Sequence, residues 1–201
     1  MVRLHLVLDI AGVIATNLSP VYWQELAEYA GCSAQELKKK FNQEIRQSFW
    51  SGETAVADYE LWLAREYPAL EKYDLPHLIH KHLKLLPAAE LLPQWSDIAD
   101  IHLLSNHRTE WVTELIRPLK PYVTSMHISD KTGFCKPDLQ AFDQLHRQLG
   151  GSRQIIYVDD QEKNLVPAKE LGWTAVLADS EGQWTERVSY LLKTFNIRNR
   201  W

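Results

Sequence analysis

The stretch LHLVLDIAGVIA, residues 4–15, decides the fold of this chain of 201 residues. It opens with an apolar run over residues 4–8, which has the length and residue types of a strand buried on both faces. The run stops at a carboxylate, Asp9, which small residues and Gly12 follow. Because a carboxylate at the end of a buried strand is costly unless something satisfies it, the stretch predicts a strand that delivers an acid to a site.

Similar apolar runs recur in the second half of the chain and alternate with amphipathic stretches. Alternation of strands and helices indicates an α/β fold with a Rossmann-like parallel sheet and right-handed crossovers. We predict four further strands, over residues 101–105, 123–127, 154–158 and 174–177. We predict helices over residues 109–119, 138–149, 162–171 and 181–195, with Pro137 suited to the first turn of the second of them.

Residues 16–87 differ from the rest because they contain no convincing strand. A connection of about 70 residues is far longer than an ordinary strand-to-helix loop. We interpret residues 16–87 as a helical cap inserted after the first strand, and residues 1–15 with 88–201 as the α/β core. Within the cap, helices are predicted over residues 21–30, 34–50, 54–67 and 75–86.

Composition excludes several classes of protein. With 22 Lys and Arg against 26 Asp and Glu, the formal charge is −4, which gives no basic footprint for nucleic acid. No run of about 18 apolar residues suggests a membrane span, and the first residues do not have the layout of a signal peptide. Two cysteines are too few for a disulfide framework. We expect a soluble, cytoplasmic protein without a nucleic-acid or membrane partner; its oligomeric state is not predicted.

Polar residues follow four of the predicted strands. Ligands of open α/β sheets bind beyond the carboxyl ends of the strands, so these groups are expected to meet at one rim. Several carboxylates together favour a hard divalent cation such as Mg²⁺, and a cation beside a lysine and a hydroxyl suits a phosphoryl group. One carboxylate could then attack phosphorus and form an aspartyl phosphate. The groups are Asp9, Ser105 with Asn106, Lys136, and Asp159 with Asp160.

The sequence resembles hydrolases of the haloacid-dehalogenase (HAD) superfamily over nearly its whole length. The resemblance rests on LDIAGV at residues 8–13, LSN at 104–106, KP at 136–137 and VDD at 158–160. Residues 9–17 and 159–165 are similar to a branch of small sugar-phosphate phosphatases. That branch includes α-D-glucose-1-phosphate phosphatase and is related to the amino-terminal phosphatase domain of epoxide hydrolases.

The resemblance implies a role for each matched residue. The function implied is Mg²⁺-dependent hydrolysis of a small phosphomonoester, with a sugar phosphate as the favoured substrate. For the metal, Asp9 and the carbonyl of Ala11 are ligands, Asp160 is a direct ligand, and Asp159 is a direct or water-mediated one. For the reaction, Asp9 is also the nucleophile, Ser105 and Asn106 hold the phosphoryl group, and Lys136 bridges nucleophile and phosphate. Asn164 is a supporting polar residue.

Ala11 departs from the family pattern, because most relatives carry there an Asp that protonates the leaving oxygen and activates water. Loss of a general acid typically costs about 10²–10⁴-fold. Three interpretations stay open. The first is a phosphatase of the branch in which this residue is often small, with modest turnover or a preference for good leaving groups. The second is a catalytically weak protein that binds a phosphometabolite or has a regulatory role, and the third is a phosphonoacetaldehyde-hydrolase-like enzyme, which would need a cap lysine to form a Schiff base.

Two features beside the motifs bear on the site. His107 is a candidate substitute proton donor, because its side chain follows Ser105 and Asn106 and an unperturbed imidazole titrates near 6.5. An aromatic set in the cap, with Arg46 nearby, is interpreted as packing, although in a cap it could line the substrate entrance. The set comprises Tyr22, Trp23, Phe49 and Trp50.

Overall fold

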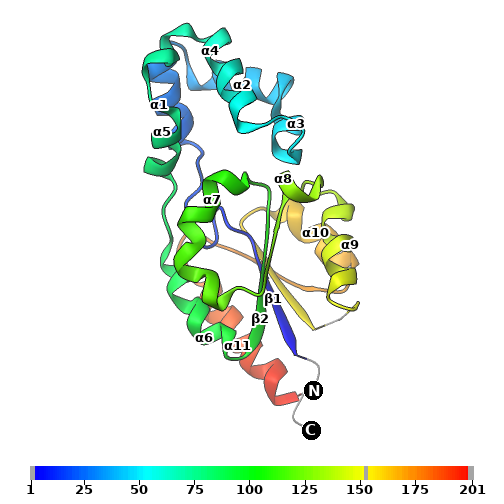
Figure 1. Cartoon of the computed structure of the whole chain (residues 1–201). Coiled ribbons are helices and arrows are strands. Elements are labelled where there is room, and N and C mark those ends of the chain that lie inside the picture. Colours follow the sequence, from blue (N-terminus) through cyan, green and yellow to red (C-terminus); the bar gives the residue numbers. More distant parts are fainter. Residues whose placement is uncertain (1–2, 152–153, 199–201) are drawn as a thin grey trace.

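The computed structural model describes residues 3–151 and 154–198 (Figure 1). Two bodies are visible: a sheet flanked by helices, and a separate group of helices above one end of that sheet. The strands are β1 (Leu4–Leu8), β2 (Ala99–Ser105), β3 (Ser125–Ile128), β4 (Ile155–Asp159) and β5 (Thr174–Leu177). All pairs are parallel, and the order is β3-β2-β1-β4-β5. The predicted parallel α/β fold with a helical insertion is confirmed.

The strand order makes β1 central and places its carboxyl end at the switch point of the sheet. The chain moves outward from β1 through β2 and β3, then returns to pair β4 with the other side of β1. In the register, Leu8 lies between Leu103 of β2 and Val158 of β4. Asp9, the next residue, therefore emerges where ligands bind in open α/β sheets.

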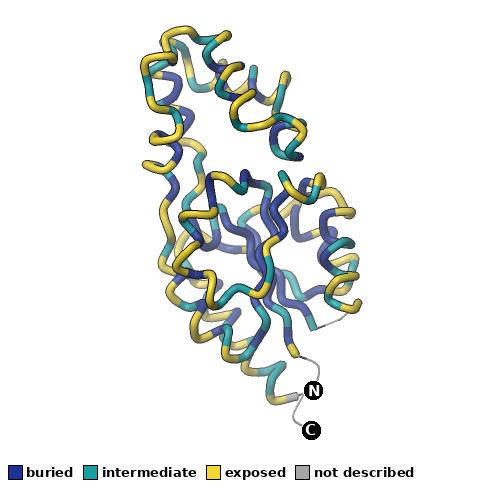
Figure 2. The backbone as a smooth tube through the Cα atoms, viewed as in Figure 1, coloured by how far each residue is buried: buried dark blue, intermediate teal, exposed yellow. Residues whose placement is uncertain are grey.

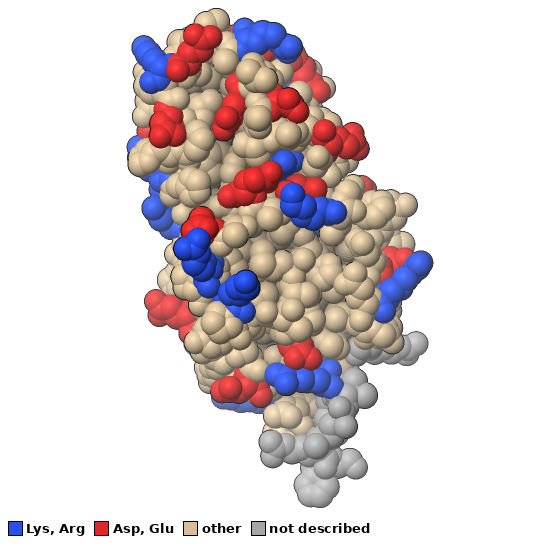
Figure 3. All heavy atoms as spheres, in the orientation of Figure 1, with Lys and Arg blue, Asp and Glu red and all other residues tan. Residues whose placement is uncertain are grey.

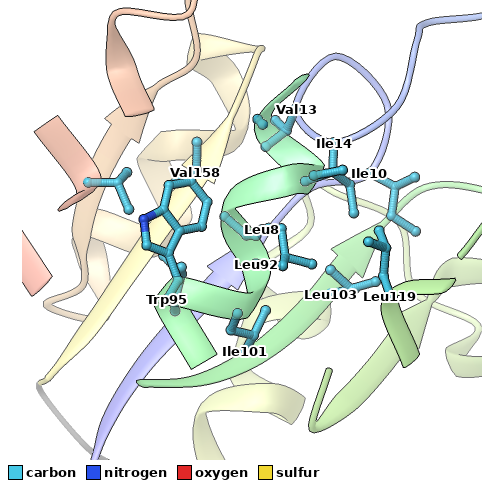
Figure 4. Close-up of a cluster of buried hydrophobic side chains, with 14 of the residues drawn as sticks. Leu8, Ile10, Val13, Ile14, Leu92, Trp95, Ile101, Leu103, Leu119 and Val158 are labelled. Carbon is cyan, nitrogen blue, oxygen red and sulfur yellow. The ribbon is translucent and has the colours of Figure 1, made fainter. Parts of the chain in front are cut away.

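Alternation along the strands builds a separate core on each face of the sheet. Leu8, Leu103 and Val158 point to the same side, where they meet Trp95 (Figure 4). Full burial of a leucine contributes roughly 1.5–3 kcal/mol relative to exposure, so this layer anchors the sheet. The helices on this side include α6 (Leu92–Ser96), α7 (Thr109–Ile116) and α11 (Trp184–Arg198), while α9 (Leu139–Gln148) and α10 (Glu162–Glu170) cover the other face.

Five helices make the upper body. They are α1 (Val21–Ala30), α2 (Ala34–Glu44), α3 (Arg46–Ser51), α4 (Val56–Glu66) and α5 (Leu75–His82). Their buried residues form a hydrophobic cluster of their own. Buried residues of these helices appear as dark blue segments of the tube in Figure 2. The two segments that connect the bodies are hydrogen-bonded to each other. Thr16 donates its N–H to the carbonyl of Lys84, and Leu86 donates its N–H to the carbonyl of Ile14.

Several predicted boundaries are wrong for local reasons. The helix predicted over residues 34–50 breaks at Ile45, whose φ of −135° is not helical. The helix predicted over 75–86 ends at His82, because the next residues pair with the other linker. Pro137 precedes its helix, which begins at Leu139. Short 3₁₀ turns complete the chain at Pro68–Lys72, Pro87–Leu91 and Arg117–Tyr122, and a single turn, α8 (Ser129–Thr132), follows β3.

Within the part of the chain that the structure describes, no helix combines the length and apolar character needed to cross a bilayer.

A chain of imidazole and hydroxyl groups crosses three strands on the α9/α10 side of the sheet. His5 Nδ1 lies 3.1 Å from His102 Nε2, His102 Nδ1 lies 2.8 Å from Ser125 Oγ, and Ser125 Oγ lies 2.9 Å from His127 Nε2. Burial lowers the pKa of all three histidines, that of His102 to about 4. These rings are therefore neutral in the folded protein at neutral pH.

The lowered pKa of His102 predicts acid sensitivity. Between about pH 6.5 and 4 the unfolded chain binds a proton that the folded chain does not, so stability falls as the pH drops through this window. We expect His102 to contribute roughly 1–3 kcal/mol of the loss. Urea unfolding across this range should show a shallower pH dependence for His102→Gln. The matched variant at the exposed His77, His77→Gln, should follow the parent; equal slopes for both variants would contradict the prediction.

Candidate active site

Asp9 is held at the end of β1 in a nearly closed environment. Its side chain is buried, Oδ1 accepts the N–H of Ile10 at 2.7 Å, and Oδ2 lies 2.8 Å from Nζ of Lys136. Burial raises the pKa of Asp9 to about 7, with the charge of Asp159 adding to the rise and Lys136 opposing it. A carboxylate in this position needs positive charge beside it to stay ionised.

Lys136 lies between two carboxylates that come from different strands. Its Nζ is 2.8 Å from Asp9 Oδ2 and 2.6 Å from Asp159 Oδ2, and the side chain is almost fully buried. Burial alone would lower the pKa of Lys136, but the two carboxylates hold it above its usual value. The lysine is therefore a fixed cation at the point where β1 and β4 end.

Asn106 fixes the backbone that carries this lysine. Its Nδ2 donates to the carbonyl of Lys136, and the N–H of Lys136 donates to Asn106 Oδ1, both at 2.7 Å. These two bonds tie the residue after β2 to the loop after β3. They give Asn106 a task that the sequence does not indicate, since its amide holds Lys136 in place.

Asp159 is fully buried, and both of its oxygens are occupied. Oδ2 accepts from Lys136 Nζ and Tyr157 Oη, while Oδ1 accepts from the N–H of Gln161 at 2.8 Å and from Asn164 Nδ2 at 2.9 Å. Burial alone would raise the pKa of Asp159, but Lys136 and these hydrogen bonds hold it below its usual value. Asp159 is thus an ionised anchor for Lys136.

Asp160 differs from its neighbour because one of its oxygens has no partner. Oδ2 accepts from Asn17 Nδ2 at 2.9 Å, whereas Oδ1 is buried without a hydrogen bond. Gly12 packs so closely that a Cβ there would lie 2.4 Å from Asp160 Oδ2, and its φ of +76° also favours glycine. The glycine of the opening motif therefore leaves room for this carboxylate.

Ligand atoms of Asp9, Asp159 and Asp160 all lie within 4.8 Å of one another. Oxygen donors in such a group suit a hard divalent cation. The open oxygen of Asp160 and the carboxylate of Asp9 fit a direct ligand role, whereas Asp159 has no free lone pair to offer without losing a bond. The donor set therefore fits a cation held mainly by Asp9 and Asp160.

A cavity of about 260 Å³ opens beside these groups. Asp9, Ala11, Ser105 and Lys136 line it, and Oγ of Ser105 is buried without a hydrogen-bond partner. The cap aromatics that the sequence favours as packing residues also line the cavity. They therefore pack within the cap and also form part of the cavity wall. Both bodies contribute rings to its wall: Tyr22, Trp23, Phe41, Phe49, Trp50, Tyr59 and Trp111.

The chain superposes on a predicted HAD-like family hydrolase from Porphyromonas gingivalis with a TM-score of 0.75, covering 96% of this chain and 99% of that one at 17% identity. The chain has the HAD-like fold. A HAD family enzyme from Bacteroides thetaiotaomicron, solved in complex with magnesium and inorganic phosphate, gives a TM-score of 0.80 at 18% identity, covering 92% and 98%. A dehalogenase gives 0.61 at 21% identity, covering 90% and 87%.

At the level of sequence, no family model and no curated protein matches the chain. The structural neighbours are too distant in sequence to assign a reaction, and they include both a phosphate complex and a dehalogenase. For this HAD-like chain, the site itself must therefore decide the chemistry.

His107 presents a neutral ring to the cavity. The N–H of Arg108 donates to His107 Nδ1 at 2.9 Å, which leaves the ring proton on Nε2. Burial lowers the pKa of His107 to about 4, and Trp50 and Trp111 make edge contacts with the ring at 6.0 Å. At neutral pH the free protein therefore offers Nε2–H as a hydrogen-bond donor, and not the imidazolium that a proton-donor role requires.

Arg108 is a residue that the sequence analysis missed. It lies in the core loop after β2, is 3% exposed, and its Nη1 donates to the cap carbonyls of Phe49 at 2.7 Å and Thr54 at 2.9 Å. Its guanidinium carbon also lies 4.9 Å from the centre of the Phe49 ring. No local pattern marks such a residue, because its partners are backbone carbonyls more than 50 positions away.

Removal of Arg108 should loosen the cap side of the cavity. In Arg108→Gln, the buried carbonyls of Phe49 and Thr54 lose a charged donor, which we expect to cost about 2–4 kcal/mol. Hydrogen–deuterium exchange should accelerate in α3 and in residues 52–55, while β1 and β2 keep their protection. Arg117→Gln, at an exposed surface pair with Glu114, is the control; equal exchange in both variants would contradict the assignment.

Proposed function

We propose that this protein is a Mg²⁺-dependent phosphatase that hydrolyses a small phosphomonoester through an aspartyl phosphate at Asp9. One observation carries the proposal: a buried carboxylate, a paired lysine and the unpartnered Oγ of Ser105 meet at one cavity, and the unpartnered Oδ1 of Asp160 belongs to the carboxylate cluster around Asp9. The open oxygens are Ser105 Oγ and Asp160 Oδ1, which suit a phosphoryl group and a cation respectively. The neighbour crystallised with magnesium and inorganic phosphate supports the same reading.

The proposed metal site would use Asp9, Asp160 and the carbonyl of Ala11. When bound there, a divalent cation would neutralise phosphoryl oxygens and favour the ionised form of Asp9. Asp159 would act through Lys136 or through a bridging water, because its own oxygens are already engaged.

The proposed reaction follows from the positions of the chain's own groups. A carboxylate oxygen of Asp9 attacks phosphorus, the bond from phosphorus to the leaving oxygen breaks, and that oxygen takes a proton from water. Lys136 and the hydroxyl of Ser105 stabilise the charge that develops on the phosphoryl oxygens. Water then attacks phosphorus, which releases phosphate and restores Asp9.

The two bodies have separate tasks in this proposal. Residues 1–15 and 88–201 form the core that holds the reacting phosphoryl group. Residues 16–87 form a cap that excludes bulk water and contacts the leaving group. A sugar phosphate is the favoured substrate, because the aromatic wall of the cavity offers flat apolar faces to a sugar ring.

A second candidate function is a phosphometabolite-binding or regulatory protein with little turnover. Among the described residues that line the cavity, Asp9 is the only carboxylate, so no second acid stands in for Ala11. A C–P hydrolase would instead need a cap lysine that forms a Schiff base with the substrate. Lys38 is a cap lysine that lines the cavity. If it has this role, borohydride would reduce the Schiff base that it forms with phosphonoacetaldehyde and leave a stable secondary amine on Lys38.

A substrate panel tests the phosphatase directly. With Mg²⁺, 4-nitrophenyl phosphate and anomeric sugar phosphates should be hydrolysed faster than simple alkyl phosphates, because no side chain protonates the leaving oxygen. Asp9→Asn should lower kcat by at least about a thousandfold. Turnover equal to that of Asp9→Asn across the panel would remove the hydrolase, and phosphate binding that persists would then favour the second candidate.

Metal binding has its own test at Asp160. Mg²⁺ should raise the melting temperature of the parent protein, since a ligand that binds only the folded state stabilises it. Asp160→Asn should remove most of that shift, because the open Oδ1 loses its charge. Glu162→Gln, an exposed acid two residues further on, should retain it. A full Mg²⁺ shift in Asp160→Asn would exclude this site.

A further inference from the structure

Several cations line the cavity. Lys38 of α2, Arg46 of α3 and Lys163 of α10 line it together with Lys136. Lys136 is neutralised by Asp9 and Asp159, but no carboxylate of the described residues lies within ion-pair distance of the other three. Nζ of Lys38 donates only to a neutral hydroxyl, that of Ser19, at 2.8 Å.

Some neutral polar groups of the cavity can donate as well. Oη of Tyr22 and Oη of Tyr59 are 2.9 Å apart, buried, and each lines the cavity. Only one of their two hydroxyl hydrogens can serve that bond, and among the described residues no other acceptor is in reach of the second. His107 adds its Nε2–H, because Nδ1 already accepts from the N–H of Arg108.

This surplus of donors is local to the cavity. On the face drawn in Figure 3, acidic and basic side chains are interspersed, and the chain as a whole carries a formal charge of −4. Lys38, Arg46 and Lys163 are exposed to solvent where they line the cavity, so a small anion can reach them.

We propose that the leaving group of the substrate carries a second anionic group, a carboxylate or a second phosphate, which Arg46, Lys38 and Lys163 bind. The inference rests on the proposed phosphatase, because it places the first phosphoryl group at Asp9, Ser105 and Lys136. A second anion would supply negative charge and acceptor oxygens to these three cations, which have no carboxylate partner among the described residues. The aromatic side chains that line the cavity would contact the carbon skeleton between the two charges.

Matched substrate pairs test the inference. Glucose 1,6-bisphosphate is compared with glucose 1-phosphate, and 3-phosphoglycerate with glycerol 3-phosphate, so that each pair differs by one phosphate or one carboxylate. We expect kcat/KM to favour the doubly anionic member of at least one pair by about tenfold or more. The pair with the larger preference identifies the anion as phosphate or carboxylate.

Variants locate the preference. In the double variant Arg46→Gln with Lys163→Gln, the preference should fall about fivefold or more through KM, with the singly charged substrates unaffected. Lys38→Gln should act in the same direction. Lys39→Gln, the neighbouring exposed lysine that does not line the cavity, is the control. Two results would overturn the inference. The first is a parent protein whose kcat/KM is the same for both members of each pair. The second is a double variant whose preference equals that of the Lys39→Gln control.

Calorimetry separates this inference from the proposed function. The same pairs are titrated into Asp9→Asn protein, which binds without turnover. Tighter binding of the doubly anionic member, lost in the Arg46→Gln/Lys163→Gln background, supports the inference even if the parent hydrolyses nothing. Equal affinity within both pairs contradicts it even if the parent is an active phosphatase.

Discussion

The ion pair of Lys136 with Asp9 and Asp159 is the interaction on which the rest of the structure depends. Burying these charges is costly, and one partner alone would be left uncompensated. Hydrogen bonds offset this cost. The side chain of Asn106 binds the carbonyl and the N–H of Lys136, and Tyr157 and Asn164 donate to the carboxylate of Asp159. This arrangement joins the ends of β1 and β4 to the loop after β3, and it leaves Asp9 poised beside a cavity.

Residues of the cap and of the core line the cavity beside this charged site. Trp111 of the core belongs to the hydrophobic cluster of the cap, and Arg108 binds two cap carbonyls, so the wall of the cavity is built from both bodies. Lys136 is paired with two carboxylates, whereas Lys38 and Arg46 of the cap and Lys163 of the core line the cavity without a carboxylate partner among the described residues. This difference underlies the proposal that phosphorus reacts beside Lys136 and that the three unpaired cations bind the leaving group.

Much of the fold could be predicted from the sequence, because its signals are local. β1 and α1 match their predicted bounds. An apolar run that stops before Asp9 defines β1, and apolar residues at helical spacing that stop before Gly31 define α1. The strand-end motifs located the site residues for the same reason. Long-range contacts could not be predicted: nothing in the sequence shows that Asn106 clamps Lys136, that Asp159 is saturated, or that Arg108 reaches Phe49.

Trapping the proposed intermediate tests the central claim, that Asp9 attacks phosphorus, most directly. Acid quench of the working enzyme followed by borohydride reduction converts an aspartyl phosphate into homoserine, which mass spectrometry of the N-terminal peptide detects. Homoserine at Asp9, formed only when substrate and Mg²⁺ are present, is the predicted result. Steady turnover with Asp9 unmodified, or with the label at Asp160 instead, would contradict the account.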